Sequence, residues 1–316
     1  MRDFRWAHLQ PHIEGGENEQ PEPEQEALDW GEQEWGTHRY HVNRLVENSI
    51  SLLPMPEKAV VLGAGNHGDV GLPRLSVHFQ QVTALDTEDN MLQEWLDSTG
   101  GIANNRVRSL TRIDYTRLDQ ISFYETFEEL LAEGKSAGEI TDYLRDCAFR
   151  VRGLEAMPHL KKAFSLVVSS GVHTQLFYPD ALMQFYGYME KYNENETRQI
   201  VEALGYLRNS LITDYNRMLL SLVKPDGRVT VWTDMILLDE DKQWIAEELD
   251  RRRTDKERTS FLFEAFGQYG IEAAVLGLRD LYDSLRPDQL LFRSWVGYTD
   301  SGKTYLIAGL SGRLRL

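Results

Sequence analysis

The sequence predicts an α/β fold: a doubly wound, mostly parallel seven-stranded sheet with a C-terminal antiparallel hairpin and helical insertions. Two observations support this prediction. Between residues 58 and 232, short apolar runs alternate with segments of helical spacing, which is the pattern of parallel strands joined by crossover helices. Near the end of the chain, two strand-like runs at 293–299 and 303–309 are joined by a short turn that contains Gly302, and such a turn favours an antiparallel hairpin.

The chain begins with a segment that we expect to form no packed structure. Residues 14–34 contain nine acidic side chains, no basic one and two prolines, so they cannot bury enough apolar surface to order themselves. We therefore predict an acidic, mobile N-terminal arm over residues 1–36, ahead of a single domain over residues 37–316. The arm, with Trp30 and Trp35, is either a lid or partner-binding segment or a solvated acidic extension.

Helices and strands alternate through the first half of the predicted sheet. Apolar side chains at helical spacing indicate a helix from Thr37, and Pro54 and Pro56 end it. The elements that follow are a strand at 59–62, a helix at about 69–79, a strand at 82–85, a helix around 91–96 and a strand at 106–110.

The second half carries more helix than simple crossovers need. A helical stretch at 123–162 precedes a fourth strand that begins at Phe164, and a long amphipathic helix runs from about Asn195 to Leu222. Because a crossover helix is usually shorter, we predict helical insertions near 117–163 and 177–222. A Pro225-Asp226-Gly227 turn then leads into a fifth strand at 228–232.

A glycine-rich turn after the first strand indicates a nucleoside cofactor. The strand is followed by Gly63-Ala64-Gly65-Asn66, and Asp86 ends the second strand. Glycines let the backbone turn sharply and approach a ligand closely, and an acid about 20 residues later can accept hydrogen bonds from ribose hydroxyls. This pattern suits a nicotinamide dinucleotide or S-adenosylmethionine (SAM).

The order of the motifs resembles the class I SAM-dependent methyltransferases over residues 58–308. The glycine turn resembles their first motif, Asp86 their ribose-binding acid, and Asp114 the acid of the loop that faces adenine. The resemblance implies SAM as cofactor, S-adenosylhomocysteine as product, and a methyl acceptor that is a small molecule or a peptide. The residues that it assigns to the cofactor are Gly63, Ala64, Gly65, Asn66, Asp86, Thr87, Asp114, Tyr115, Ser169 and Ser170.

The end of the fourth strand departs from two methyltransferase subclasses. Amino-adenine and protein-glutamine methyltransferases carry Asn or Asp, two prolines and an aromatic residue there, whereas this chain has Ser169-Ser170-Gly171-Val172. His173 follows, where it is either a catalytic base for a hydroxyl or carboxyl acceptor or a structural histidine at a loop-to-helix junction. Six nearby aromatic residues either wall an acceptor pocket or pack as core: Phe177, Tyr178, Phe185, Tyr186, Tyr188 and Tyr192.

Three alternatives to methyl transfer stay open. The same fold could transfer the aminocarboxypropyl group of SAM, as enzymes resembling nicotianamine synthase do, and methylthioadenosine would then replace S-adenosylhomocysteine as by-product. The chain could also be a SAM-binding module without turnover. The third alternative, a nicotinamide-dependent dehydrogenase, stays open only if the terminal hairpin is absent.

The composition limits the kinds of partner and the cellular setting that we expect for this chain. Lys and Arg number 34 against 50 Asp and Glu, a net charge of −16 that disfavours a nucleic-acid partner. Cys147 is the only cysteine, and His38 and His41 have no evident third ligand, so we predict neither disulfides nor a metal site. The lack of an apolar leader or a membrane-length apolar run favours a cytoplasmic protein without membrane contact. The identity of the acceptor and the oligomeric state do not follow from the sequence.

Overall fold

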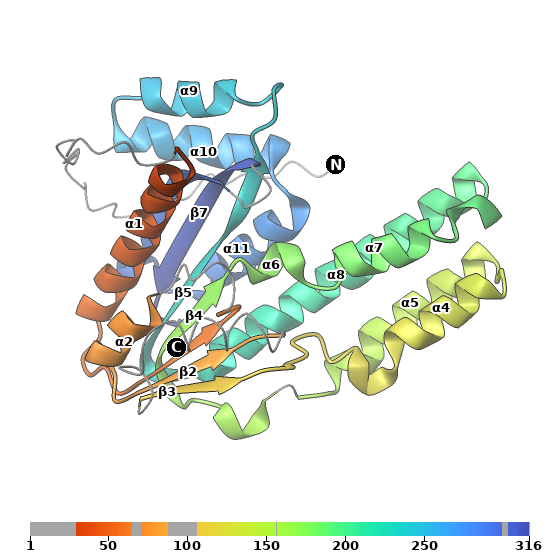
Figure 1. The fold of residues 1–316 in the computed structure, drawn as a ribbon, viewed down its shortest axis with the longest axis horizontal. Coiled ribbons are helices and arrows are strands. Elements are labelled where there is room, and N and C mark those ends of the chain that lie inside the picture. Colours follow the sequence, from red (N-terminus) through yellow and green to blue (C-terminus); the bar gives the residue numbers. More distant parts are fainter. Residues whose placement is uncertain (1–29, 65–70, 88–105, 156, 299–302, 316) are drawn as a thin grey trace.

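The computed structural model describes residues 30–64, 71–87, 106–155, 157–298 and 303–315, with side chains from Gly36 onward (Figure 1). Its centre is a seven-stranded sheet in the order β3-β2-β1-β4-β5-β7-β6. The strands are β1 (Lys58–Leu62), β2 (Gln81–Leu85), β3 (Val107–Leu110), β4 (Phe164–Ser170), β5 (Val223–Leu237), β6 (Leu291–Tyr298) and β7 (Thr304–Gly312).

The pairing of the strands confirms the predicted fold class. β1 to β5 are parallel where they pair, whereas β7 runs antiparallel to both β5 and β6. β6 and β7 therefore form the expected antiparallel pair, although the turn at 299–302 lies outside the described residues.

Helices cover both faces of the sheet, as a doubly wound fold requires. One face packs against α1 (Trp30–Ser51) and α2 (Leu72–His78), with Trp232 and Trp295 contributing the largest side chains of that core. The other face packs against α8 (Glu194–Leu222), α9 (Trp244–Arg251), α10 (Asp255–Tyr269) and α11 (Glu272–Ser284). Helix α1 begins before Thr37, where the sequence predicted its start. The helix predicted around 91–96 lies outside the described part of the chain.

β5 is longer than expected at both ends. Val223 pairs with Phe164 and Arg228 with Leu166, so four residues of β5 bulge out opposite a single residue of β4, and the expected Pro225-Asp226-Gly227 turn lies within this bulge. A Cβ on Gly227 would come 2.8 Å from the carbonyl oxygen of Ser165, so the bulge packs too closely for a side chain at this position. Beyond Trp232, β5 continues to Leu237 because it pairs with β7 there.

Four helices form a lobe that extends away from the sheet (Figure 1). They are α4 (Phe123–Ala132), α5 (Ala137–Arg152), α7 (Tyr178–Tyr186) and the first half of α8, and they enclose an apolar cluster of their own. The expected continuous stretch at 123–162 is broken by Gly134, whose φ is +68°, and by the Ser136–Glu139 capping box that starts α5. Of the six aromatic residues after β4, Phe177 and Phe185 are core residues of this lobe, Tyr178, Tyr188 and Tyr192 pack against it, and Tyr186 is exposed.

Candidate functional site

Those of the expected cofactor residues that the structure describes lie at or near the carboxyl edge of the sheet. Leu62 pairs with both Leu85 and Ser169, and Leu85 pairs with Leu110, so the ends of β1, β2, β3 and β4 lie side by side. The residues that follow these strands therefore share one edge, which is where open α/β sheets bind their ligands.

Gly63 makes the turn that follows β1. Its φ is +69°, in the left-handed region where glycine avoids the steric cost of a side chain. Its N–H donates to the Tyr115 hydroxyl at 3.2 Å, and the N–H of Ala64 donates to the carbonyl of Leu85 at 3.2 Å. The start of the glycine turn is therefore fixed against β2 and the loop after β3, whereas Gly65 and Asn66 lie outside the described residues.

Tyr115, from the loop after β3, links the turn after β1 to the end of β2. Its hydroxyl accepts from Gly63 and donates to the carbonyl of Leu85 at 3.0 Å, and the residue is 3% exposed. Burial, followed by the nearby Tyr215, raises the pKa of Tyr115 well above its usual value, so the phenol stays protonated and keeps both hydrogen bonds.

Asp86 lies directly after β2 and is 8% exposed. Its N–H donates to the carbonyl of Leu110, and its carbonyl accepts from Ile113, which ties this position to the strand beside it. The Thr87 hydroxyl lies 3.4 Å from Oδ1 of Asp86. A carboxylate thus lies at the edge of the sheet next to the glycine turn.

Asp114 shapes its own loop. One carboxylate oxygen accepts from the N–H of Thr116 at 2.7 Å and from its hydroxyl at 2.6 Å, and the other accepts from the N–H of Asp119 at 2.9 Å. The loop is also held from outside, because the buried Arg117 lies 3.7 Å from the buried Asp214 of α8 and donates to the carbonyl of Leu154 at 2.8 Å. These contacts fix the loop after β3 against α8 and the segment that follows α5.

Ser169 and Ser170, the last residues of β4, are both buried. The hydroxyl of Ser169 lies 2.7 Å from that of Tyr215, and the rings of Tyr215 and Tyr115 are 5.7 Å apart edge to face. Tyr215 belongs to α8, so the long inserted helix contacts the end of β4 and the loop after β3.

His173 lies on the short helix α6 (Val172–Gln175) and is completely buried. Its Nε2 is 2.8 Å from Oδ1 of Asn216, and its ring stands edge to face with Tyr215 at 5.3 Å. Burial lowers the pKa of His173 to about 4, while Asn216 and Asp280 raise it by less, so the imidazole is neutral near pH 7.

Sequence reasoning did not place three residues near this site: Tyr215, Asn216 and Asp280. They come from α8 and α11, whose contacts with α6 no local pattern reveals. One signal was present for Asn216, which lies on the apolar stripe of α8 between Ile212 and Leu219 and is completely buried. A polar residue that interrupts an apolar stripe must find partners inside the protein.

The other histidine pair joins α1 to β6. Nδ1 of His38 accepts from the indole N–H of Trp295 at 3.0 Å, and the ring of His41 stacks on Trp295 at 5.5 Å. Arg293 lies 3.3 Å from Nδ1 of His41. Among the described residues, no group of three or more His, Cys, Asp or Glu could hold a metal ion, and no helix there is long and apolar enough to cross a membrane.

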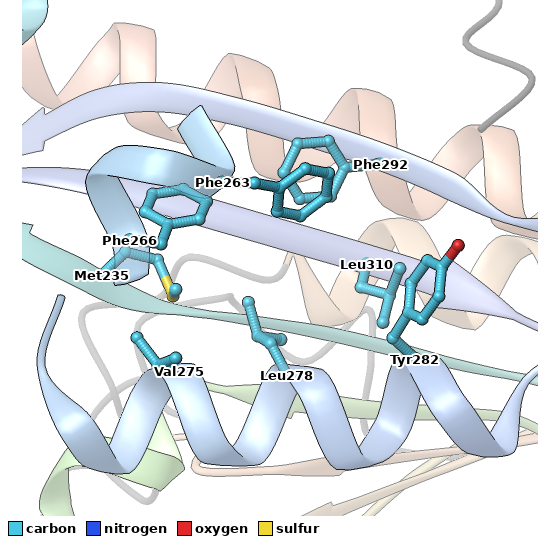
Figure 2. Close-up of a pocket in the computed structure, with 8 residues that line it drawn as sticks. All are labelled: Met235, Phe263, Phe266, Val275, Leu278, Tyr282, Phe292 and Leu310. Carbon is cyan, nitrogen blue, oxygen red and sulfur yellow. The ribbon is translucent and has the colours of Figure 1, made fainter. Parts of the chain in front are cut away.

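An apolar pocket lies apart from this edge, between α10, α11 and the last three strands of the sheet (Figure 2). Side chains of α11 form one wall and face those of α10 and the strands, and the Tyr282 hydroxyl is the only polar side-chain group among those that line it. The lining consists of Met235, Phe263, Phe266, Val275, Leu278, Tyr282, Phe292 and Leu310. The pocket is therefore almost wholly apolar, and none of the expected cofactor residues lines it.

Comparisons with known proteins give no family for the chain. No protein-family model matches it, and no curated protein matches it in sequence. A spermidine synthase in complex with the transition-state analogue AdoDATO has a TM-score of 0.40 and 12% identity, and the match covers 88% of this chain and 62% of that one. A putative sarcosine dimethylglycine methyltransferase from Galdieria sulphuraria has a TM-score of 0.37 and 12% identity, with 87% and 84% covered.

A third similar structure is the complex between the Haloferax volcanii Trm112 methyltransferase activator and the putative methyltransferase, with a TM-score of 0.39, 10% identity, and 92% of this chain and 100% of that one covered. Because these TM-scores are all below 0.5, the assignment of the fold rests on the strand order of the sheet. That order, with helices on both faces, defines a Rossmann-like α/β fold.

Proposed function

We propose that this protein is a SAM-dependent methyltransferase that acts on a small molecule or a peptide. The observation that carries the proposal is the sheet itself: the order β3-β2-β1-β4-β5-β7-β6, with an antiparallel β7, places a left-handed Gly63 and the carboxylate of Asp86 on neighbouring strand ends. This combination is what the resemblance to class I methyltransferases leads one to expect.

The described residues fit the cofactor. Gly63 and Ala64 present backbone without bulk at the end of β1, and Asp86 offers a carboxylate for the ribose hydroxyls. Asp114 and Tyr115 would support the adenine side of the site, Asp114 by shaping its loop and Tyr115 by holding Gly63. Thr87 would lie beside the ribose, and Ser169 and Ser170 would border the cofactor at the end of β4. Gly65 and Asn66 complete the proposed set.

The terminal hairpin argues against a nicotinamide dinucleotide. A dinucleotide-binding Rossmann sheet is usually parallel and ordered 3-2-1-4-5-6, whereas here an antiparallel β7 is inserted between β5 and β6. In a dinucleotide site the N-terminus of a helix must bind a pyrophosphate, and SAM has no phosphate. For SAM the glycine turn therefore needs only to let the backbone approach the nucleoside closely.

SAM, when bound, supplies a methyl group on an already activated sulfonium. The protein therefore contributes mainly position, and a base is required only when the acceptor must lose a proton. His173 is our candidate for that base: it is neutral near pH 7, and its ring packs against that of Tyr215, whose hydroxyl lies 2.7 Å from that of Ser169 at the end of β4. The acidic character of the chain makes a small molecule or peptide a better acceptor than a nucleic acid.

Calorimetric titration with SAM, S-adenosylhomocysteine and NAD tests the cofactor. We expect both SAM and S-adenosylhomocysteine to bind and NAD to give no heat of binding; NAD binding without SAM binding would overturn the proposal. The reaction is tested by the by-product formed from SAM with a panel of small acceptors. S-adenosylhomocysteine indicates methyl transfer, methylthioadenosine indicates aminocarboxypropyl transfer, and tight binding with neither product indicates a binding module.

A further inference from the structure

His173 is held on several sides by protein. A Cβ on Gly277 of α11 would lie 2.2 Å from Cδ2 of the ring and 2.8 Å from Nε2, so α11 runs directly over this edge of the imidazole. Tyr215 packs edge to face with the ring, and Asn216 contacts Nε2. Nδ1 is the other polar atom of the ring; it is buried as well, and it has no hydrogen-bond partner among the described residues.

The side-chain amide of Asn216 can have only one orientation. Its Nδ2 lies 2.9 Å from the carbonyl oxygen of Gly277 and 3.0 Å from Oδ2 of Asp280, and both of these atoms are acceptors. A flipped amide would place its oxygen against two other oxygens and lose both hydrogen bonds. The oxygen of Asn216 must therefore face His173.

That orientation determines the tautomer of the imidazole. Because Oδ1 of Asn216 can only accept, Nε2 of His173 must carry the hydrogen, and the neutral ring then has its lone pair on Nδ1. A chain of hydrogen bonds thus runs from the carboxylate of Asp280, through the amide of Asn216, to the imidazole.

We infer that Asp280 and Asn216 are positioning residues that hold His173 as its Nε2–H tautomer, and that Nδ1 is the nitrogen that receives a hydrogen bond from an N–H or O–H group of the methyl acceptor. The arrangement follows the logic of an oriented base, in which a third group fixes the ring so that one nitrogen is available. A neutral Nδ1 can only accept, so the acceptors that it suits are alcohols, phenols, carboxylic acids and amines that carry their own proton.

The role assigned to Nδ1 rests on the proposed function, whereas the tautomer does not. The tautomer can be measured on the cofactor-free protein, so a failure of SAM binding and a failure of the hydrogen-bond relay are separate results. If SAM does not bind but His173 is the Nε2–H tautomer, the relay stands and the methyltransferase proposal falls.

The test is nitrogen NMR of the full chain labelled with ring-¹⁵N histidine, with the His173 signals assigned by their loss in His173→Gln. We expect an unprotonated Nδ1 and a protonated Nε2 from pH 5.5 to 8.5. In Asn216→Leu the constraint is lost, and both nitrogens should move toward the averaged shifts of exchanging tautomers. Asp280→Asn keeps an acceptor for Nδ2 of Asn216, so it should retain the wild-type tautomer.

The wild-type spectrum alone can overturn the inference, even if Asn216→Leu does not fold. A protonated Nδ1, or a cationic ring at pH 7, would do so. A folded Asn216→Leu protein with an unchanged His173 spectrum would show that the burial of the ring, and not the relay, selects the tautomer. Once an acceptor is found, Asn216→Leu should lower kcat about as much as His173→Gln while leaving the Kd for SAM unchanged; a normal kcat in this variant would remove the positioning role.

Discussion

The backbone N–H of Gly63 donates to the side-chain hydroxyl of Tyr115 at 3.2 Å, although 52 residues separate them. The same hydroxyl donates to the carbonyl of Leu85. One phenol thus fixes the glycine turn after β1 against the end of β2, and the left-handed backbone of the proposed cofactor site is supported by a residue from the loop after β3.

We expect Tyr115→Phe to lower both stability and cofactor affinity. The N–H of Gly63 would lose its partner at a buried position, which costs about 1–3 kcal/mol. Urea unfolding and calorimetry with S-adenosylhomocysteine measure the two effects. Tyr143→Phe is the matched control, because the Tyr143 hydroxyl also donates to a backbone carbonyl, that of Phe123 at 3.0 Å, but within the helical lobe. The control should lose stability and keep its affinity for S-adenosylhomocysteine. If both variants lose the same affinity, the effect of Tyr115→Phe comes from a general loss of stability and not from the glycine turn.

Asp86→Ala should weaken the binding of SAM by about 1–3 kcal/mol, because the ribose hydroxyls would lose a charged acceptor in a nearly buried position. Asp142→Ala on α5 is the control, since its side chain is 83% exposed and lies in the helical lobe. The Kd from calorimetry is the measurement. If the two variants bind SAM as tightly as the wild type does, another residue must contact the ribose.

The elements that were predicted well are those determined by local sequence. The apolar run that begins at Phe164 has no polar alternation, as a buried parallel strand requires, and it forms β4 with every residue buried. The extension of β5 to Leu237 was not predicted, because Thr233 and Asp234 look like the end of a strand until β7 supplies their partners. Pairing between distant strands decides where such a strand ends.

The same distinction applies to the candidate site. Gly63 and Asp86 were found because their spacing follows from one strand-helix-strand unit. Tyr215, Asn216 and Asp280 were not, because their partners come from another helix or strand and are brought together only by tertiary packing. Asp114 was assigned to adenine by resemblance, and the structure adds that its carboxylate organises the loop in which it lies.

Removal of residues 1–29 should leave the domain folded, because it keeps α1 whole and the first buried side chain described in that helix is His38. We propose that the removed segment affects turnover of the acceptor and not folding. The melting temperature of the truncated protein should match that of the full chain, and a lid role would appear as a higher KM for the acceptor. A melting temperature many degrees lower would show that the arm is part of the packed domain.

Stability should fall as the pH is lowered from about 6.5 toward 4, in part because of His173. Its pKa in the folded protein is about 4, so the unfolded chain binds a proton in this window that the folded protein does not. The loss between pH 7 and pH 5 is on the order of 2 kcal/mol for one such histidine. The groups that face the ring are Asp280, whose charge opposes the shift, and the neutral Tyr215.

Urea unfolding of the wild type and of His173→Gln at pH 7, 6 and 5 measures this effect. The variant should be less stable at pH 7 because it loses packing. The difference in the free energy of unfolding between the wild type and the variant should become smaller as the pH falls. The pKa of His41 is also lowered to about 4, first by burial and then by Arg293 and His38. His41 should therefore lower stability in the same pH range, and His41→Gln serves as an independent comparison. A constant difference between wild type and His173→Gln at all three pH values would contradict the lowered pKa.

Gly277→Ala should destabilise the protein by about 1–3 kcal/mol, because overpacking forces the surroundings to move. The new methyl group would overlap the His173 ring, so α11 or α6 must shift. Gly267→Ala in α10 is the control: a Cβ there has no atom within 4 Å, and alanine should stabilise the helix by about 0.5–1 kcal/mol. A double-mutant cycle then identifies the cause. In a His173→Ala background the overlap disappears, so Gly277→Ala should become neutral or stabilising; if it costs as much as in the wild type, the methyl group collides with something other than the imidazole.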